Sequence, residues 1–175
     1  MHRTFVISDI WFNRNCKDDD MNITDINNVK ISAWNNTVSD NDDVYVLGGF
    51  GISDLYNIIV RLKGRIHFLD NFFNDDERRF IEDMKSNIEK SGDIQLIDRI
   101  IFENKQIMTL NDLDVILSYN SLSNWSGKNT GTLCFHGIDT ENDIQNHTIT
   151  SSAIYWNYYP ACINDIKDSI DNLEV

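Results

Sequence analysis

The chain has 175 residues, of which 41% are hydrophobic, and its 28 acidic and 15 basic residues give a formal net charge of −13. This is the length of one domain, which we expect to span residues 1–175 and to bury a core without cross-links. The charge argues against nucleic-acid binding, because so negative a surface repels phosphate. No apolar run is long enough to cross a membrane.

The sequence predicts an intracellular protein without disulfides. The N-terminus has neither the long apolar run nor the small-residue cleavage site of a secretory signal, so we expect a cytoplasmic protein. The cysteines are Cys16, Cys134 and Cys162, an odd number without CxxC spacing, which indicates neither a disulfide framework nor a zinc knuckle. Cys134 lies in an apolar run and is expected in the core. Richness in Asn, Asp and Ile suggests an AT-rich genome, such as that of a bacterial virus.

The first half of the chain predicts three strands that alternate with three helices. Apolar runs predict the strands at 5–7, 44–47 and 66–69, and the first delivers Asp9 to its carboxyl end, where open α/β sheets place their chemistry. Thr24 or Asp25 is expected to cap the first helix and Ser53 the second. The segment 74–76 leads into the third, which ends near residue 91.

From Ile94 onward the pattern changes to short strand-like runs separated by turn residues, with no long helix among them. The runs are Ile94 to Phe102, Gln106 to Leu110, Val115 to Ser118, Thr132 to His136 and Ser151 to Tyr155. A short amphipathic segment from Ile163 to Leu173 follows. The order of elements therefore favours an α/β protein whose second half is rich in strands.

Five segments, spread over nearly the whole chain, carry a common pattern. They are SDNDDVYVLGGF (Ser39 to Phe50), RLKGRIHFLDNFFN (Arg61 to Asn74), VILSYNSLSNW (Val115 to Trp125), FHGIDT (Phe135 to Thr140) and SAIYWNYYPA (Ser152 to Ala161). In the same order they resemble SDDDTVYVLGDF, RLxGKIHLIRGNHD, VILSHYPLxxW, LHGHTH and VDVWNYYPV, motifs of the small bacterial and phage branch of the calcineurin-like metallophosphoesterases. The resemblance implies that family's fold, an α/β (α+β) sandwich of two packed β-sheets flanked by helices.

The resemblance also implies a dinuclear metal site, in which two ions activate a water and clamp phosphate oxygens. Asp9 is the ligand that this sequence retains. Elsewhere Trp11 replaces the first His, Gly49 the bridging Asp, Phe72 the Asn and Phe73 the His of GNHD, Tyr119 the His of LSH, and Ile138 and Thr140 the two His of GHxH. A one-residue shift would keep Asn71 as a ligand but would still place Phe72 at the His.

Such a set does not hold two divalent ions, since Gly, Phe and Ile offer no donor and the bridging carboxylate is gone. We therefore expect no metal, no other cofactor and no catalytic residue, and a structural role for Asp9 at the strand end. The leading interpretation is a catalytically inactive phosphoesterase-like protein that serves as a protein-binding or structural module.

The residues that replace the ligands suggest how such a module would work. Trp11, Phe72, Phe73, Tyr119 and Ile138 are expected to converge on the former cleft. They either fill it as ordinary core or form an exposed aromatic patch, in which Trp11, Phe73 and Tyr119 are the candidate partner-binding residues, because Trp and Tyr dominate interface hot spots. The partner would be a protein, either a second copy of the chain or a phage or host protein.

Two other functions remain open on the sequence alone. One is a working phosphodiesterase or phosphatase with a metal site rebuilt from Asp9, Asp70, Asn71, Asp75 and His136. The other is an acidic mimic of nucleic acid that inhibits a host or partner protein, which only the net charge of −13 suggests. His67 and His136 lie in strand patterns, where lone histidines are more often structural than catalytic.

Overall fold

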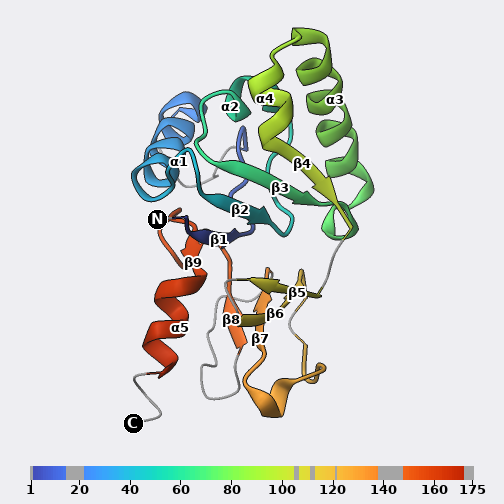
Figure 1. Ribbon diagram of the computed structural model, residues 1–175. Coiled ribbons are helices and arrows are strands. Elements are labelled where there is room, and N and C mark those ends of the chain that lie inside the picture. The colour runs from blue at the N-terminus through green and yellow to red at the C-terminus, as the bar shows by residue number, and fades with distance from the viewer. Residues whose placement is uncertain are drawn as a thin grey trace.

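The computed structural model describes residues 2–14, 22–104, 107–110, 113–120, 122–137 and 148–171. These residues form a layer of helices, a five-stranded sheet and a four-stranded sheet (Figure 1). The expectation of an α/β protein with two packed sheets flanked by helices is confirmed at this level. Among the residues singled out above, Cys16, Gln106, Ile138, Thr140 and Leu173 lie outside the described residues.

The five-stranded sheet has the order β4-β3-β2-β1-β9. Strands β1 to β4 run parallel, and β9 is antiparallel to β1. The strands are β1 (Thr4–Ile7), β2 (Asp43–Val46), β3 (Arg65–Leu69), β4 (Ile100–Glu103) and β9 (Ala161–Cys162). Because neighbouring parallel strands end at the same edge, the residues that follow β1, β2 and β3 come together there.

Four helices cover one face of this sheet (Figure 1). They are α1 (Ile23–Thr37), α2 (Leu55–Ile59), α3 (Asp75–Ser91) and α4 (Ile94–Arg99). Alternate strand residues such as Phe5, Val44 and Phe68 point into the core that these helices close, as the two-residue period of a strand requires. A capping box of Asn74 and Glu77 begins α3, and Gly92 ends it with a left-handed backbone.

The four-stranded sheet packs on the other face of the first sheet. Its order is β5-β6-β7-β8, with β5 antiparallel to β6 and the other pairs parallel. The strands are β5 (Ile107–Leu110), β6 (Leu113–Ser118), β7 (Leu133–His136) and β8 (Thr148–Thr150). Side chains such as Tyr45 and Leu69 meet Leu117 and Phe135 in the core between the sheets. Helix α5 (Ile163–Asp171) adds Ile163 to this core.

The ends of several elements differ from the sequence predictions. Asn22 caps α1, because its side chain accepts from the amide of Asp25, whereas Thr24 and Asp25 lie inside the helix. Asp54, not Ser53, is the N-cap of α2, and it has a left-handed backbone without a side-chain cap. The segment Thr132 to His136 is a strand as expected, although it begins at Leu133.

Two of the predicted strands are wrong in part. The run from Ile94 to Phe102 begins as α4, because Asp93 caps this helix through the amide of Leu96, and only β4 continues as a strand. In the run from Ser151 to Tyr155, Ser152 forms an isolated β-bridge with Ser8, and the chain turns from Ala153 onward, where the amide of Trp156 bonds back to the carbonyl of Ser152. The described helices include none that is long and apolar enough to span a membrane.

The two cysteines in the described part of the chain are buried free thiols. Cys134 lies on β7 beside Trp125 and is fully buried, so its predicted place in the core is confirmed. Burial raises the pKa of the Cys134 thiol to about 11 and also raises that of Cys162. Neither thiol therefore has the thiolate character that a reactive cysteine needs.

Candidate functional site

The backbone leaves β1 and β2 as two adjacent segments at the carboxyl edge of the first sheet. The amides of Asp9, Trp11 and Phe12 donate to the carbonyls of Gly48, Gly49 and Phe50 over 3.1, 2.7 and 2.8 Å. Asp9 and Trp11 have φ angles of 54° and 47°. A left-handed backbone in a residue other than Gly costs about 1–3 kcal/mol, and such residues gather at functional sites. Asp tolerates it better than Trp, so Trp11 is the more unusual.

Asp9 receives a hydrogen bond from the second sheet. Tyr119, which follows β6, donates its hydroxyl to Oδ1 of Asp9 over 3.1 Å. Burial raises the pKa of Asp9, the bond from Tyr119 opposes that rise, and the nearby carboxylate of Glu77 adds to it. Burial and the charge of Asp9 also raise the pKa of Tyr119, so the phenol keeps its proton and remains the donor.

The ring of Tyr119 occupies the space between two glycine backbones. A Cβ atom on Gly48 would lie 3.0 Å from both Cδ2 and Cε2 of the ring, and one on Gly137 would lie 2.7 Å from Cδ2. Real Cβ atoms essentially never approach other atoms to less than 3.0 Å. The ring therefore fills the edge between the two sheets; Gly137 makes room for it, and a side chain at Gly48 would crowd it.

Gly49 has no room for the side chain that a bridging ligand would need. A Cβ atom there would lie 2.5 Å from both Cα and Oδ1 of Asp9, and the residue has a left-handed φ of 61°. Its amide donates to Oε1 of Glu77 over 2.7 Å. The other oxygen of Glu77 accepts from the amide of Asn74. This buried carboxylate therefore binds the backbone after β2 and also completes the capping box at the start of α3.

Phe72 and Phe73 point to opposite sides of the first sheet. Phe72 ends the 3₁₀ helix η1 (Asp70–Phe72) and packs against the core between the sheets. Phe73 is 3% exposed in the core under the helices, with its ring 6.0 Å from that of Phe68. The expectation that both converge on the cleft is therefore wrong, and Phe73 is too deeply buried to contact a protein partner.

Trp11 lies half-buried at the edge of the site. The guanidinium of Arg14 lies 4.7 Å from the centre of its ring. The backbone carbonyl of Trp11 accepts a hydrogen bond from Nζ of Lys30, a residue of α1 that is only 2% exposed. Nζ of Lys30 also lies 5.4 Å from the centre of the Tyr158 ring, so one buried cation joins α1 to the ends of two distant segments.

The residues present do not fit the dinuclear metal site that the resemblance implies. Asp9 is the one expected ligand with a carboxylate, and its Oδ1 accepts from Tyr119. Among the described residues, no three His, Cys, Asp or Glu side chains are placed to hold a metal ion. In the alternative set with Asn71, the four acidic and histidine members, Asp9, Asp70, Asp75 and His136, therefore do not come together as a metal site. Asp75 is almost fully exposed, whereas His136 is buried at the end of β7.

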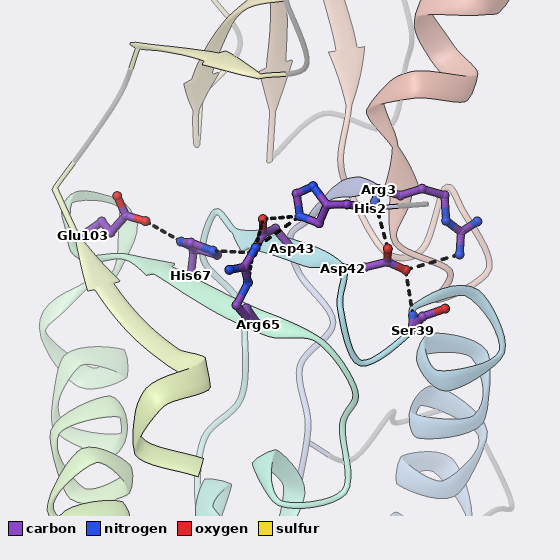
Figure 2. A network of polar contacts seen from close by, with 8 residues as sticks. All are labelled: His2, Arg3, Ser39, Asp42, Asp43, Arg65, His67 and Glu103. Atoms are coloured by element: carbon purple, nitrogen blue, oxygen red, sulfur yellow. Dashed lines mark hydrogen bonds and ion pairs between the residues drawn. The ribbon is translucent and has the colours of Figure 1, made fainter. Parts of the chain in front are cut away.

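A second group of polar side chains lies at the opposite ends of β2 and β3 (Figure 2). His67 bonds to Oδ1 of Asp43 over 3.1 Å and to Oε1 of Glu103, and its ring stacks on Tyr45 at 4.3 Å. Arg65 joins the same carboxylate of Asp43. These bonds tie β2, β3 and β4 together, so His67 has the structural role expected of it.

Two residues of the candidate site, Glu77 and Lys30, were missed by the sequence predictions, although each left a signal. Glu77 stands three residues after Asn74, which is the capping-box spacing. Lys30 stands between Ile26 and Trp34 in the apolar stripe of α1, at the four-residue spacing that buries a side chain. A charge at such a position indicates a buried polar contact.

Comparisons with known proteins give a fold but no family. No protein-family model matches the chain, and no curated protein matches it. Among solved structures, the chain is similar to the crystal structure of a protein of unknown function, AQ665, from Aquifex aeolicus, with a TM-score of 0.64 and 15% sequence identity over 96% of this chain and 99% of that one. At this identity the likeness shows a shared fold alone.

Proposed function

We propose that the chain is a catalytically inactive phosphoesterase-like protein that works by binding another protein. The five ordered motifs and the two-sheet sandwich support a calcineurin-like fold. The observation that carries the loss of activity is the contact of Tyr119 with Asp9. A phenol donates to the one carboxylate retained among the expected ligands, and Gly49 lacks room for a bridging one.

The Tyr119–Asp9 contact stabilises the strand ends without an ion. Two close divalent cations need several ionised ligands to offset their charge. Here the hydroxyl group lies where an ion bound to Asp9 would compete with it, and Glu77 is already engaged by two backbone amides. In this proposal the Tyr119–Asp9 contact therefore has a structural role at the edge between the sheets, and the surface around it carries the function.

The surface that suits a protein partner is the 154–159 loop, which follows β8. Ile154, Tyr155 and Tyr159 are 65%, 44% and 45% exposed. Hydrogen bonds to the protein backbone hold the loop in place. Nε1 of Trp156 donates to the carbonyl of Thr150 over 2.7 Å, and the amide of Tyr158 donates to the carbonyl of Ala153 over 2.6 Å. Aromatic side chains on a rigid backbone lose little conformational entropy on binding and form hot spots.

Trp11 extends this surface. The amide of Ala153 donates to the carbonyl of Ser8 over 2.8 Å, so the 154–159 loop starts beside the end of β1, and Lys30 joins Trp11 to Tyr158. The net charge of −13 favours a partner with a basic face over a second copy of the same acidic chain. Trp11 remains a candidate partner-binding residue, whereas Tyr119 is engaged with Asp9.

Metal analysis and a hydrolase assay test the loss of activity. The purified protein is incubated with Mn²⁺, desalted and analysed for bound metal, and its hydrolysis of bis(p-nitrophenyl) phosphate is measured beside that of the Asp9→Asn variant. We expect less metal than one ion per chain and the same background rate for both proteins. Stoichiometric metal together with a rate that the variant abolishes would refute the proposal.

A matched pair of double variants tests the binding surface. Ile154→Ser with Tyr155→Ser removes two exposed apolar side chains from the loop, and Ile94→Ser with Ile97→Ser removes two from α4, of comparable exposure. A partner captured by the wild type is expected to be lost from the loop variant and retained by the α4 variant. Equal retention by both would rule out the loop as the binding surface.

A further inference from the structure

A cavity of about 350 Å³ opens between η1, α3 and β4, at the carboxyl ends of β3 and β4. Three apolar side chains line it, Phe73, Ile81 and Phe102. Phe102 is half-buried, and its ring stacks on that of Phe68 with centres 5.6 Å apart. A volume of this size suits a small molecule, and ligands of open α/β sheets bind at this end of the strands.

Four charged side chains of both signs surround the same cavity. Arg78, Glu82 and Lys85 come from successive turns of α3, and Asp70 comes from η1. Burial is the largest influence on the pKa of Asp70 and raises it. The other three groups lie close enough to act on the same pKa: Lys85 and Arg78 lower it, and Glu82 raises it. The local charge of the four groups is zero, unlike that of the whole chain.

These charges do not neutralise one another by direct contact. Among the ion pairs of the described residues, Glu82 and Lys85 take no part. Nζ of Lys85 instead lies 4.8 Å from the centre of the Phe102 ring. Arg78 makes only long contacts, of 3.8 Å to the carboxylate of Asp75 and 3.4 Å to the carbonyl of Asp70. Cations and carboxylates around the cavity are thus available to a ligand.

We propose that this cavity binds a small zwitterion with an apolar body, of the chemical class of a free apolar α-amino acid. Arg78 and Lys85 suit its carboxylate, Asp70 and Glu82 suit its ammonium group, and Phe73, Ile81 and Phe102 suit its side chain. A dianionic phosphate would be repelled by the two carboxylates, and a purely cationic ligand by the two basic groups. A ligand with both charges satisfies all four.

Calorimetric titration with L-phenylalanine and three relatives tests the ligand class. N-acetyl-L-phenylalanine lacks the ammonium group, L-phenylalaninamide lacks the carboxylate, and glycine lacks the apolar body. We expect L-phenylalanine to bind with a Kd of about 0.1–1 mM, a value typical of a ligand of this size, and each relative to bind at least about tenfold more weakly. Equal affinity for either blocked relative would overturn the zwitterion, and no saturable binding of L-phenylalanine would overturn the site.

Variants of α3 locate the ligand. Lys85→Gln is expected to weaken the binding of L-phenylalanine about tenfold. Glu82→Gln is expected to weaken the binding of L-phenylalanine but not that of N-acetyl-L-phenylalanine, which has no ammonium group for Glu82 to hold. Arg79→Gln is the matched control, because Arg79 lies on the same helix, is 77% exposed and does not line the cavity. If Arg79→Gln reduced the affinity as much as Lys85→Gln, the binding would reflect helix charge alone and the proposal would be wrong.

Discussion

The hydroxyl of Tyr119 donates to Oδ1 of Asp9 over 3.1 Å, which joins the residue after β6 in one sheet to the residue after β1 in the other. The ring behind that hydroxyl lies against Gly48 and Gly137. Ring and hydroxyl thus act together: the ring excludes water from the edge between the sheets, and the hydroxyl satisfies the carboxylate that this exclusion buries.

Tyr119→Phe is expected to lower the free energy of unfolding by about 1–2 kcal/mol, because it keeps the ring and removes the hydroxyl that donates to a partly buried carboxylate. Urea denaturation at pH 7 measures the loss. Tyr155→Phe is the control, since Tyr155 is an exposed tyrosine, and its effect is expected within about 0.5 kcal/mol of zero. Equal stability of the two variants would show that the hydrogen bond contributes nothing.

Asp9→Asn tests the charge of the same pair. Burial raises the pKa of Asp9 in the folded protein above its ordinary value of 3.8, so the fold favours the protonated acid. The folded protein therefore loses stability as the pH rises from 3.8 through the higher pKa that Asp9 has in the fold. The amide oxygen of Asn still accepts from Tyr119. We expect the variant to gain on the wild type in unfolding free energy between pH 4 and pH 7. A variant that lost ground over this range would indicate that the carboxylate is held by an unseen cation.

For Asp43 we expect the opposite effect of pH on the free energy of unfolding. Burial works against ionisation of Asp43, but hydrogen bonds from His67, Arg65 and His2 outweigh it and lower the pKa to about 2 (Figure 2). Its ionised form therefore stabilises the fold above pH 3.8, and this contribution is lost as the pH falls from about 4 towards 2. Asp43→Asn is expected to flatten the acid limb of a stability curve, and Asp75→Asn, at an exposed carboxylate, is expected to leave it unchanged.

Three strands of the first sheet, β1, β2 and β3, could be predicted because they are buried on both faces, whereas the two-residue strand β9 was not predicted. Helices cover one face and the second sheet the other, so 5–7, 44–47 and 66–69 read as continuous apolar runs. The segment 94–99 has the same apolar character, and a short apolar run does not distinguish strand from helix. The cap that Asp93 supplies to Leu96 decides it, and the structure is a helix.

The candidate site was predicted as a set of positions but not as an arrangement. That Gly49 and Tyr119 supply no carboxylate or imidazole to a metal can be read from the sequence. The divergence of Phe72 and Phe73 cannot, because it depends on a 3₁₀ turn that sends adjacent side chains to different cores. The bond from Gly49 to Glu77 joins residues 28 apart, and local patterns carry no information on such a contact.

A pair of glycine variants measures how tightly Gly49 packs against Asp9. Gly49 and Gly92 have φ angles of 61° and 66°, so an added methyl group strains both backbones alike, by about 1 kcal/mol. A Cβ on Gly92 meets nothing within 4 Å, whereas one on Gly49 would lie 2.5 Å from Cα of Asp9. Gly49→Ala is therefore expected to cost at least about 2 kcal/mol more than Gly92→Ala in urea denaturation, as overpacking in a closed site does.

Gly49→Asp extends the same comparison to function. It introduces the carboxylate that a bridging ligand would need, but the backbone of Asp9 blocks its Cβ as it blocks that of Ala. We expect this variant to be destabilised at least as much as Gly49→Ala and to bind no more Mn²⁺ than the wild type. A stable Gly49→Asp protein that took up metal would show that the edge between the sheets opens readily, and the closed site described for Tyr119 and Asp9 would then be only one of its states.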